Sequence, residues 1–150
     1  HMALTRARVV FGSTAAREEV EGVIASVLTT ERPDRDIIAD AVTMRGEMAT
    51  HKPPLGAFDA KLSPGGLVDL EFTVHVAQLT TRSGFDPDLR VAIEQLAAVG
   101  ALPDRLITAH DLLSRLLVTM RLVAPGADLP TPATRALIAK ALALPDWEIS

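Results

Sequence analysis

The sequence predicts an all-α protein, a compact helical bundle of about six to seven helices with one irregular loop over residues 52–66. Apolar residues recur every three or four positions along most of the chain, whereas the alternation expected of β-strands is almost absent. Capping and helix-breaking residues separate these periodic stretches, and 150 residues is the length of one ordinary domain. Because each apolar stripe needs a partner, we expect the helices to pack against one another.

The first two helices are expected before residue 30. A short helix, or the tail of one, is predicted over residues 4–11, with Gly12 as its C-cap. Ser13 or Thr14 then caps a longer helix. Its apolar positions fall on a single stripe, formed by Val20, Val23, Ile24, Val27 and Leu28.

A third helix is predicted to begin at Asp34, with Ile37, Ala41, Met44 and Met48 as its stripe. Asp34 and Asp36 invite comparison with the paired carboxylates that hold magnesium in nucleotidyltransferases of the polymerase-β type. There the pair lies on a strand, where residues i and i+2 share a face. At a helix start, the same step turns by roughly 200°. We therefore interpret Asp34 and Asp36 as a cap and a first-turn carboxylate, and predict no metal ligands in this chain.

Residues 52–66 lack helical periodicity and contain three prolines and three glycines. Since loops carry function more often than periodic helices do, this is where we look for chemistry. Gly65 and Gly66 directly precede a helix predicted from Leu67, so their amides could approach a phosphate closely. Lys61 could add a positive charge. The alternative interpretation is a tight turn that simply requires glycine.

The helix from Leu67 carries two carboxylates and a polar stripe. Asp69 and Glu71 lie in its first turns, where negative charge suits the helix dipole, but they diverge and cannot chelate one metal ion together. The stripe at helical spacing is interpreted as either a solvated face or an interface, and consists of Glu71, His75, Gln78 and Arg82.

Three further helices are expected in the second half. Asp86-Pro87 is predicted to start one that Gly100 ends. Pro103 opens the longest helix, residues 125–130 break it, and Thr131-Pro132 starts the last one. The predicted apolar positions are Leu89, Ile93, Leu96, Leu106, Leu113, Leu117, Met120, Leu137, Ile138 and Ala141. His110, on an apolar stripe, is interpreted as a satisfied core histidine, and the histidines predict no metal site.

The composition is typical of a folded globular chain and excludes several functional classes. Apolar residues make up 48% of the sequence and charged residues 23%. The net charge of −4, with one Trp, four Phe and no Tyr, argues against nucleic-acid binding. The absence of Cys excludes disulfides and cysteine metal sites. With no long apolar run and no signal-peptide pattern, we expect a cytoplasmic protein that does not bind membranes.

Three segments carry a family resemblance. Phe58–Phe72, FDAKLSPGGLVDLEF, resembles the F-D-L-K-x-x-x-G-G segment and the following D-x-E-F of bacterial glutamine-synthetase adenylyltransferases. Leu4–Gly12, LTRARVVFG, is similar to the helix that leaves their catalytic domain, and Met44-Arg45 with Met48 matches their M-R-x-x-M element. The similarity covers residues 4 to about 78, and the later helices only by pattern. Two departures are Ala60 for the usual leucine, and His75 for the usual glutamine.

The resemblance implies a helical domain that follows a nucleotidyltransferase domain in a bifunctional enzyme. One half of such enzymes transfers AMP from ATP to a tyrosine of glutamine synthetase, and the other removes it by phosphorolysis, under control of PII-type proteins and glutamine. Mg and ATP would serve the intact enzyme, with the metal-binding carboxylates upstream, so we expect this chain alone to be inactive. Its closing stretch looks more like the C-terminal, adenylylating half.

The same resemblance suggests roles for individual residues. Lys61 and the amides of Gly65 and Gly66 would face nucleotide phosphates, while Asp69 and Glu71 would hold the loop or meet the partner domain. Three arginines are further candidates for contacts with the nucleotide or with the partner domain, namely Arg6, Arg8 and Arg45. The alternative is a non-catalytic module that docks a partner domain or a PII-type regulator.

The two ends of the chain indicate the limits of the predicted domain. His1-Met2 looks like the remnant of an expression tag, so we expect a single helical domain over residues 3–150. After Pro145-Asp146-Trp147 a further helix is expected, so the domain would be cut short at its C-terminal end.

Overall fold

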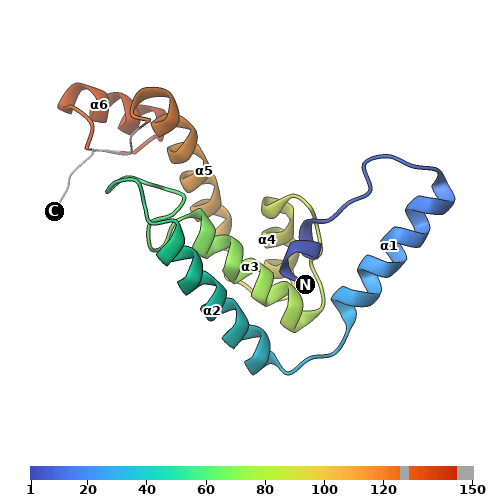
Figure 1. Cartoon of the computed structure of the whole chain (residues 1–150). Helices are drawn as coiled ribbons and strands as arrows, with labels where there is room; N and C mark the ends of the chain where they lie inside the picture. Colours follow the sequence, from blue (N-terminus) through green and yellow to red (C-terminus); the bar gives the residue numbers. More distant parts are fainter. Residues whose placement is uncertain (126–128, 145–150) are drawn as a thin grey trace. The chain divides into compact units, whose positions relative to one another are not determined.

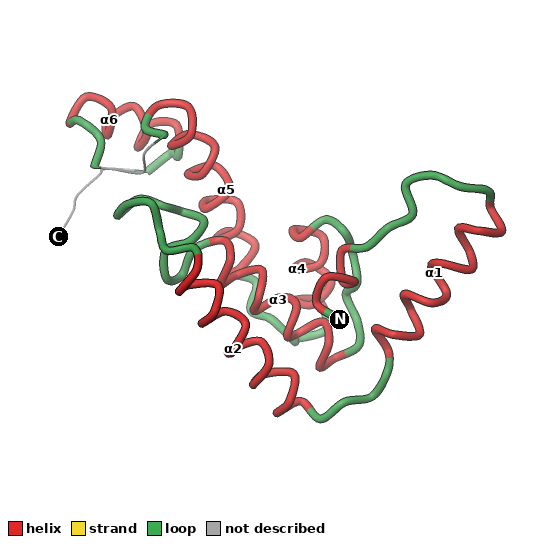
Figure 2. The backbone as a smooth tube through the Cα atoms, in the orientation of Figure 1, coloured by secondary structure: helices red, strands yellow, loops and turns green. Residues whose placement is uncertain are grey.

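The computed structural model describes residues 1–125 and 129–144, which form helices joined by loops and contain no strand (Figures 1 and 2). The all-α class is confirmed. In the described residues the elements are a 3₁₀-helix η1 (Met2–Arg6) and the α-helices α1 (Thr14–Thr29), α2 (Asp34–His51), α3 (Leu67–Thr81), α4 (Leu89–Ala98), α5 (Arg105–Val123) and α6 (Pro132–Ala141). Residues 145–150, which include Pro145-Asp146-Trp147, lie outside the described residues.

The chain divides into two compact units. Unit 1 comprises His1–Met44 and Glu71–Ile107, and unit 2 comprises Arg45–Leu70 and the described residues from Thr108 onward. The borders fall within α2, α3 and α5.

Unit 1 is built on apolar side chains from α1, α2, α3 and α4. Leu28, Ile37 and Leu79 form a buried cluster, against which Met2, Leu4, Ile24 and Phe85 pack. Ala92, Ile93 and Leu96 of α4 are completely buried. Burial of these side chains supplies the main driving force for folding of the unit.

Unit 2 has a core of its own, formed by α5, α6 and the loop over residues 52–66. Met120, Ile138 and Leu142 are buried together, and Phe58 of the loop packs against them with Leu116 and Ala124. The loop is thus anchored to the core of its unit through an aromatic side chain.

Local capping chemistry places most helix starts where the sequence predicts them. The hydroxyl of Ser13 accepts the N–H of Ala16, and that of Thr131 accepts the N–H of Thr134, so α1 and α6 begin as expected. The prediction for α4 was wrong by two residues. Asp86 accepts the N–H of Asp88 in a turn, and Asp88 caps the helix by accepting the N–H groups of Arg90 and Val91.

The short helix predicted over residues 4–11 is wrong. A 3₁₀-helix ends at Arg6, and Ala7 is extended with φ −71° and ψ 139°. The segment continues through Val9, Val10 and Phe11, which favour helix weakly, and Phe11 is 95% exposed. Without a buried face, so short a helix has nothing to offset the cost of ordering it.

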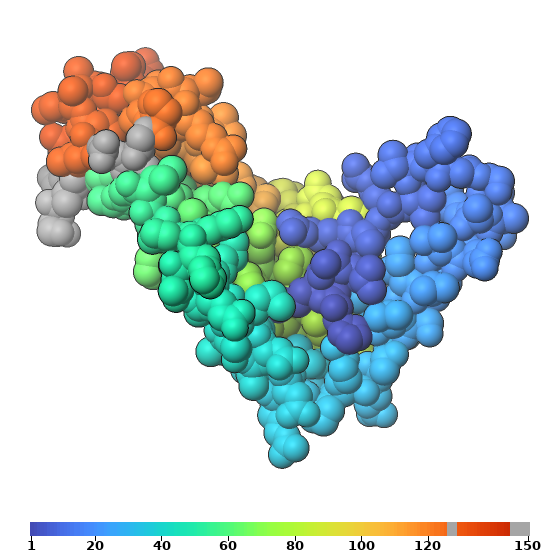
Figure 3. Space-filling view, in the orientation of Figure 1, coloured from blue at the N-terminus to red at the C-terminus, as the bar shows by residue number. Residues whose placement is uncertain are grey.

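Several predicted apolar stripes are only partly buried. In α1 only Leu28 is buried, and Val20 and Val23 are exposed. Figure 3 shows α1 as part of the blue surface. In α6, Leu137 and Ala141 are exposed, and Ile138 and Ala139 are buried instead. The stripe identifies a helix, but the neighbouring elements decide how much of it is covered.

Candidate functional site

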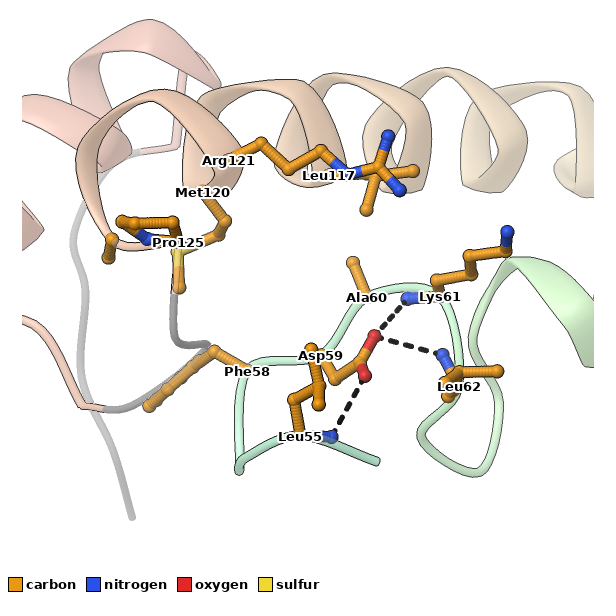
Figure 4. A pocket seen from close by; sticks show the side chains of 11 residues that line it. Leu55, Phe58, Asp59, Ala60, Lys61, Leu62, Leu117, Met120, Arg121 and Pro125 are labelled. Atoms are coloured by element: carbon orange, nitrogen blue, oxygen red, sulfur yellow. Dashed lines mark hydrogen bonds between the residues drawn. The ribbon is translucent and has the colours of Figure 1, made fainter. Parts of the chain in front are cut away.

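The loop over residues 52–66 is organised around the carboxylate of Asp59. This side chain is buried, and one of its oxygens accepts the N–H groups of Lys61 and Leu62, each at 3.0 Å. Its other oxygen accepts the N–H of Leu55, also at 3.0 Å (Figure 4). A single carboxylate therefore satisfies three backbone donors that no helix or strand could satisfy.

The electrostatics of Asp59 follow from these contacts. Burial by itself raises the pKa of the carboxyl, but the three backbone N–H donors and the nearby charge of Lys61 outweigh burial. The pKa of Asp59 is consequently held below its ordinary value, and the side chain is ionised at neutral pH. Sequence reasoning missed this residue, although an aspartate within a loop rich in proline and glycine is itself a turn signal.

The two glycines before α3 are required for different reasons. Gly65 has a φ of +78°, in the left-handed region that glycine adopts without strain. A Cβ on Gly66 would lie 2.8 Å from the carbonyl oxygen of Ala60 and 2.9 Å from that of Ser63. The pair therefore forms a tight, closely packed turn.

The backbone amides around this turn have partners within the chain. The N–H of Gly65 donates to Asp69 Oδ2 at 2.6 Å, and that of Gly66 donates to the carbonyl of Ser63 at 2.8 Å. At the start of α3, Leu67 and Val68 donate to the carbonyls of Ala60 and Lys61. A phosphate that used these amides would have to displace the loop's own acceptors.

Arg45 connects α2 to both ends of the turn. Its guanidinium donates to the carboxylate of Asp69 and, at 3.2 Å, to the carbonyl of Leu62. Asp69 in turn accepts the N–H of Gly65. The structure thus brings together three of the residues singled out in the sequence, Arg45, Gly65 and Asp69, as a network that holds the loop in place.

Lys61 lies on the same loop with its side chain exposed. It borders a cavity of about 260 Å³ within unit 2, which is lined by the loop and by α5. Arg121 of α5 borders the same cavity, and nothing in the sequence pattern marked it. In Figure 4, Met120 extends from α5 toward the loop and Ala60 points into the same space, while the Arg121 side chain runs along α5 to end beside Leu117.

The remaining candidates belong to unit 1. Arg6 Nη1 lies 3.4 Å from Glu71 Oε1 in a pair between partly exposed side chains, and Arg8 is exposed in the segment after η1. Such a pair contributes little stability in water. Glu71 therefore does not share the network of Asp69, although the two are separated by one residue.

The polar stripe of α3 is not a solvated face, because two of its four members are buried. His75 and Gln78 are 6% and 1% exposed, and His75 Nδ1 lies 3.0 Å from Gln78 Oε1. Gln78 Nε2 donates to the carbonyl of Gly84 at 2.6 Å. Burial is the largest influence on the pKa of His75 and lowers it, and the hydrogen bond to Gln78 only partly compensates.

Neither a metal cluster nor a membrane span is found in the part of the chain that the structure describes. There, no three His, Asp or Glu side chains gather where they could hold a metal ion. None of the described helices is both long enough and apolar enough to cross a bilayer.

Comparison with known proteins identifies relatives of this chain. A bifunctional glutamine synthetase adenylyltransferase/adenylyl-removing enzyme from Brucella suis is 34% identical over 160 aligned positions, which cover 99% of this chain and 16% of the relative. Proteins with the same name from Mesorhizobium japonicum and Rhizobium meliloti are 42% and 37% identical, over 58% and 75% of this chain and 9% and 11% of the relatives.

No protein-family model and no solved structure matches the chain. The chain spans about a sixth of the length of the Brucella suis relative, with 99% of its own residues aligned. The similarity extends past the three motifs into the later helices. The chain therefore belongs, as a segment, to the family of bifunctional glutamine synthetase adenylyltransferase/adenylyl-removing enzymes.

Proposed function

We propose that this chain is a helical domain that helps to form the nucleotide site of a glutamine synthetase adenylyltransferase. In the intact enzyme, AMP would be transferred from ATP to a tyrosine of glutamine synthetase, or removed by phosphorolysis. The observation that carries the proposal is the loop over residues 52–66, which is ordered by Asp59 and Asp69 and presents the exposed side chain of Lys61. A loop held from both ends can keep a positive charge at a defined position.

The roles divide between one contact residue and its supports. Lys61 would meet the phosphates of the nucleotide, where a cation stabilises negative charge. Asp59, Asp69, Arg45 and the glycine pair would position the loop. Mg and ATP would be bound largely by an upstream nucleotidyltransferase domain of the same polypeptide, which supplies the metal-binding carboxylates. The fragment alone would then be inactive. We favour the adenylylating half as its origin.

Lysine substitution in an intact enzyme that contains this domain tests the role of Lys61. Lys61→Ala should lower transfer of labelled AMP from ATP to glutamine synthetase by about tenfold or more, because a charge-assisted phosphate contact is lost. Lys52→Ala is the matched control, since Lys52 is an exposed lysine of the same loop that does not border the cavity. If the two variants transfer AMP at the same rate and both keep the helical content of the wild type, Lys61 does not contact the nucleotide phosphates.

A second experiment tests the dependence on the upstream domain. This chain and a version extended by the nucleotidyltransferase domain are assayed for magnesium-dependent AMP transfer. We expect activity only in the extended protein. If the extended protein is folded but shows only phosphate-dependent removal of AMP, the domain belongs to the removing half.

A docking role is the alternative, and one observation favours it. The amides of Gly65 and Gly66 already have acceptors within the chain, so they are not free for a phosphate. In addition, Val10, Phe11 and Val23 are strongly exposed. A docking module would bind the upstream domain or a PII-type protein, and its loop signals in NMR spectra would not respond to ATP. Shifts confined to residues 52–66 on addition of ATP would favour the nucleotide role instead.

A further inference from the structure

The cavity of unit 2 combines an apolar interior with two positive charges at its border. Phe58, Leu117 and Met120 contribute apolar surface, and Lys61 and Arg121 contribute the charges (Figure 4). Its volume of about 260 Å³ is just below the usual range of small-molecule sites. It has room for a single ring with a small head group.

Positive charges outnumber negative charges among the described residues that line the cavity. Within the part of the chain that the structure describes, neither Lys61 nor Arg121 makes an ion pair, and both side chains are exposed. The one carboxylate among the described lining residues is Asp59. Its two oxygens accept three backbone N–H groups, and its charge interacts with that of Lys61, so it offsets one of the two positive charges. In a chain with a net charge of −4, this leaves a local excess of positive charge.

We infer that this cavity is a binding site for a small organic anion, with an apolar body among Phe58, Leu117 and Met120 and a phosphate or carboxylate head between Lys61 and Arg121. Burial of the apolar body would supply most of the affinity, and the two cations would select for charge. Arg121 can donate two parallel hydrogen bonds to such a head group, which a lysine cannot. All lining groups belong to unit 2 of this chain, so binding requires neither the upstream domain nor magnesium.

The inference goes beyond the proposed nucleotide role, and the two can fail separately. AMP transfer tests Lys61 in the intact enzyme, whereas the cavity is tested by direct binding to this chain. If the anion binds to this chain but Lys61→Ala transfers AMP as the wild type does, the cavity site is supported. The same result would rule out the phosphate-binding role of Lys61.

The test is an NMR titration of the 150-residue chain labelled with ¹³C at its methionine methyl groups. Of the four methionines, Met120 lines the cavity, and Met2, Met44 and Met48 serve as internal controls. The probes are phenyl phosphate and benzoate, which distinguish a phosphate head from a carboxylate head. Benzyl alcohol is the neutral control. We expect a saturable shift of Met120 with at least one anion, and binding of benzyl alcohol weaker by about tenfold or more.

Two arginines of α5 provide a matched pair of variants. Arg121→Ala should weaken binding of the anion by about tenfold or more, whereas Arg115→Ala, an exposed position on the same helix outside the cavity, should leave it unchanged. Because both side chains are exposed, both variants should keep the helical content of the wild type. No saturable shift of Met120 with either anion, or equal affinity in Arg121→Ala and Arg115→Ala, would overturn the inference.

Discussion

His75 Nδ1 lies 2.9 Å from the hydroxyl oxygen of Thr5, seventy positions earlier in the chain. The Thr5 hydroxyl donates to the carbonyl of Met2 at 2.7 Å, so it is an acceptor toward the imidazole. Gln78 Oε1 is a second acceptor for the same nitrogen. Two acceptors at this nitrogen require a hydrogen on Nδ1 of His75. A buried polar cluster thus ties η1 to α3.

Protonation of His75 should destabilise the folded chain. Burial lowers the pKa of His75 below the unfolded value of 6.5, so between these two pKa values the unfolded state binds more protons. The stabilisation of the fold by the neutral side chain of His75 is complete above the unfolded pKa. It is lost as the pH falls through the folded pKa. Urea unfolding at about pH 7.5 and about pH 5 should show this loss.

Two glutamine substitutions isolate the effect of His75. His75→Gln should reduce the pH dependence of the free energy of unfolding, because the titrating group is gone. His51→Gln, at the exposed end of α2, should retain the wild-type dependence. If both variants keep the same slope between the two pH values, His75 does not titrate as its burial requires.

Asp59→Asn should destabilise the chain by about 1–3 kcal/mol at neutral pH, since the amide cannot replace a carboxylate that accepts three backbone N–H groups. The folded pKa of Asp59 lies below its unfolded value, so its stabilisation is complete above about pH 4 and is lost as the pH falls through the folded pKa. The difference between wild type and variant should therefore narrow in acid. A difference that is constant from about pH 6 to about pH 3 would contradict this account.

Gly66→Ala should lower the free energy of unfolding by about 1–3 kcal/mol, because the new Cβ would press against the carbonyl oxygens of Ala60, Ser63 and Lys61. Gly46→Ala is the control. A Cβ at Gly46 in α2 meets nothing within 4 Å, so alanine should stabilise the helix by about 0.5–1 kcal/mol. Chemical denaturation followed by circular dichroism compares the two, and shifts of the same sign would refute the packing argument.

Arg45→Ala should lower the free energy of unfolding by about 1–3 kcal/mol, because it removes the partner of Asp69 and the hydrogen bond to the Leu62 carbonyl. Arg35→Ala breaks a pair of highly exposed side chains with Asp36 and should change stability by less than about 0.5 kcal/mol. Hydrogen exchange of the Gly65 amide provides a second measurement. Its protection should fall in Arg45→Ala and persist in Arg35→Ala; unchanged protection in both would mean that Arg45 does not support the turn.

Much of the candidate site was accessible to sequence reasoning because its signals are local. The clustered prolines and glycines of residues 52–66 predicted the loop, and the structure shows it between α2 and α3. The same stretch contains the predicted site residues Lys61 and Gly65, and Asp69 lies in the first turn of the helix that follows. The pairing of Asp69 with Arg45 could not be derived, because those two residues are separated by 24 positions. Arg121 was missed for the same reason, since only folding brings α5 to the loop.

By itself, the sequence determined the all-α class, most helix limits and the place of the irregular loop. Periodicity, caps and helix breakers act over a few residues, so their physics can be recognised without knowledge of the fold. Only the tertiary structure decided that His75 and Gln78 are buried, that residues 7–11 leave the helix, and that Asp59 organises the loop. Each of these features depends on desolvation or on hydrogen bonds that form only in the folded backbone. Neither can be inferred from the composition or from the spacing of residues.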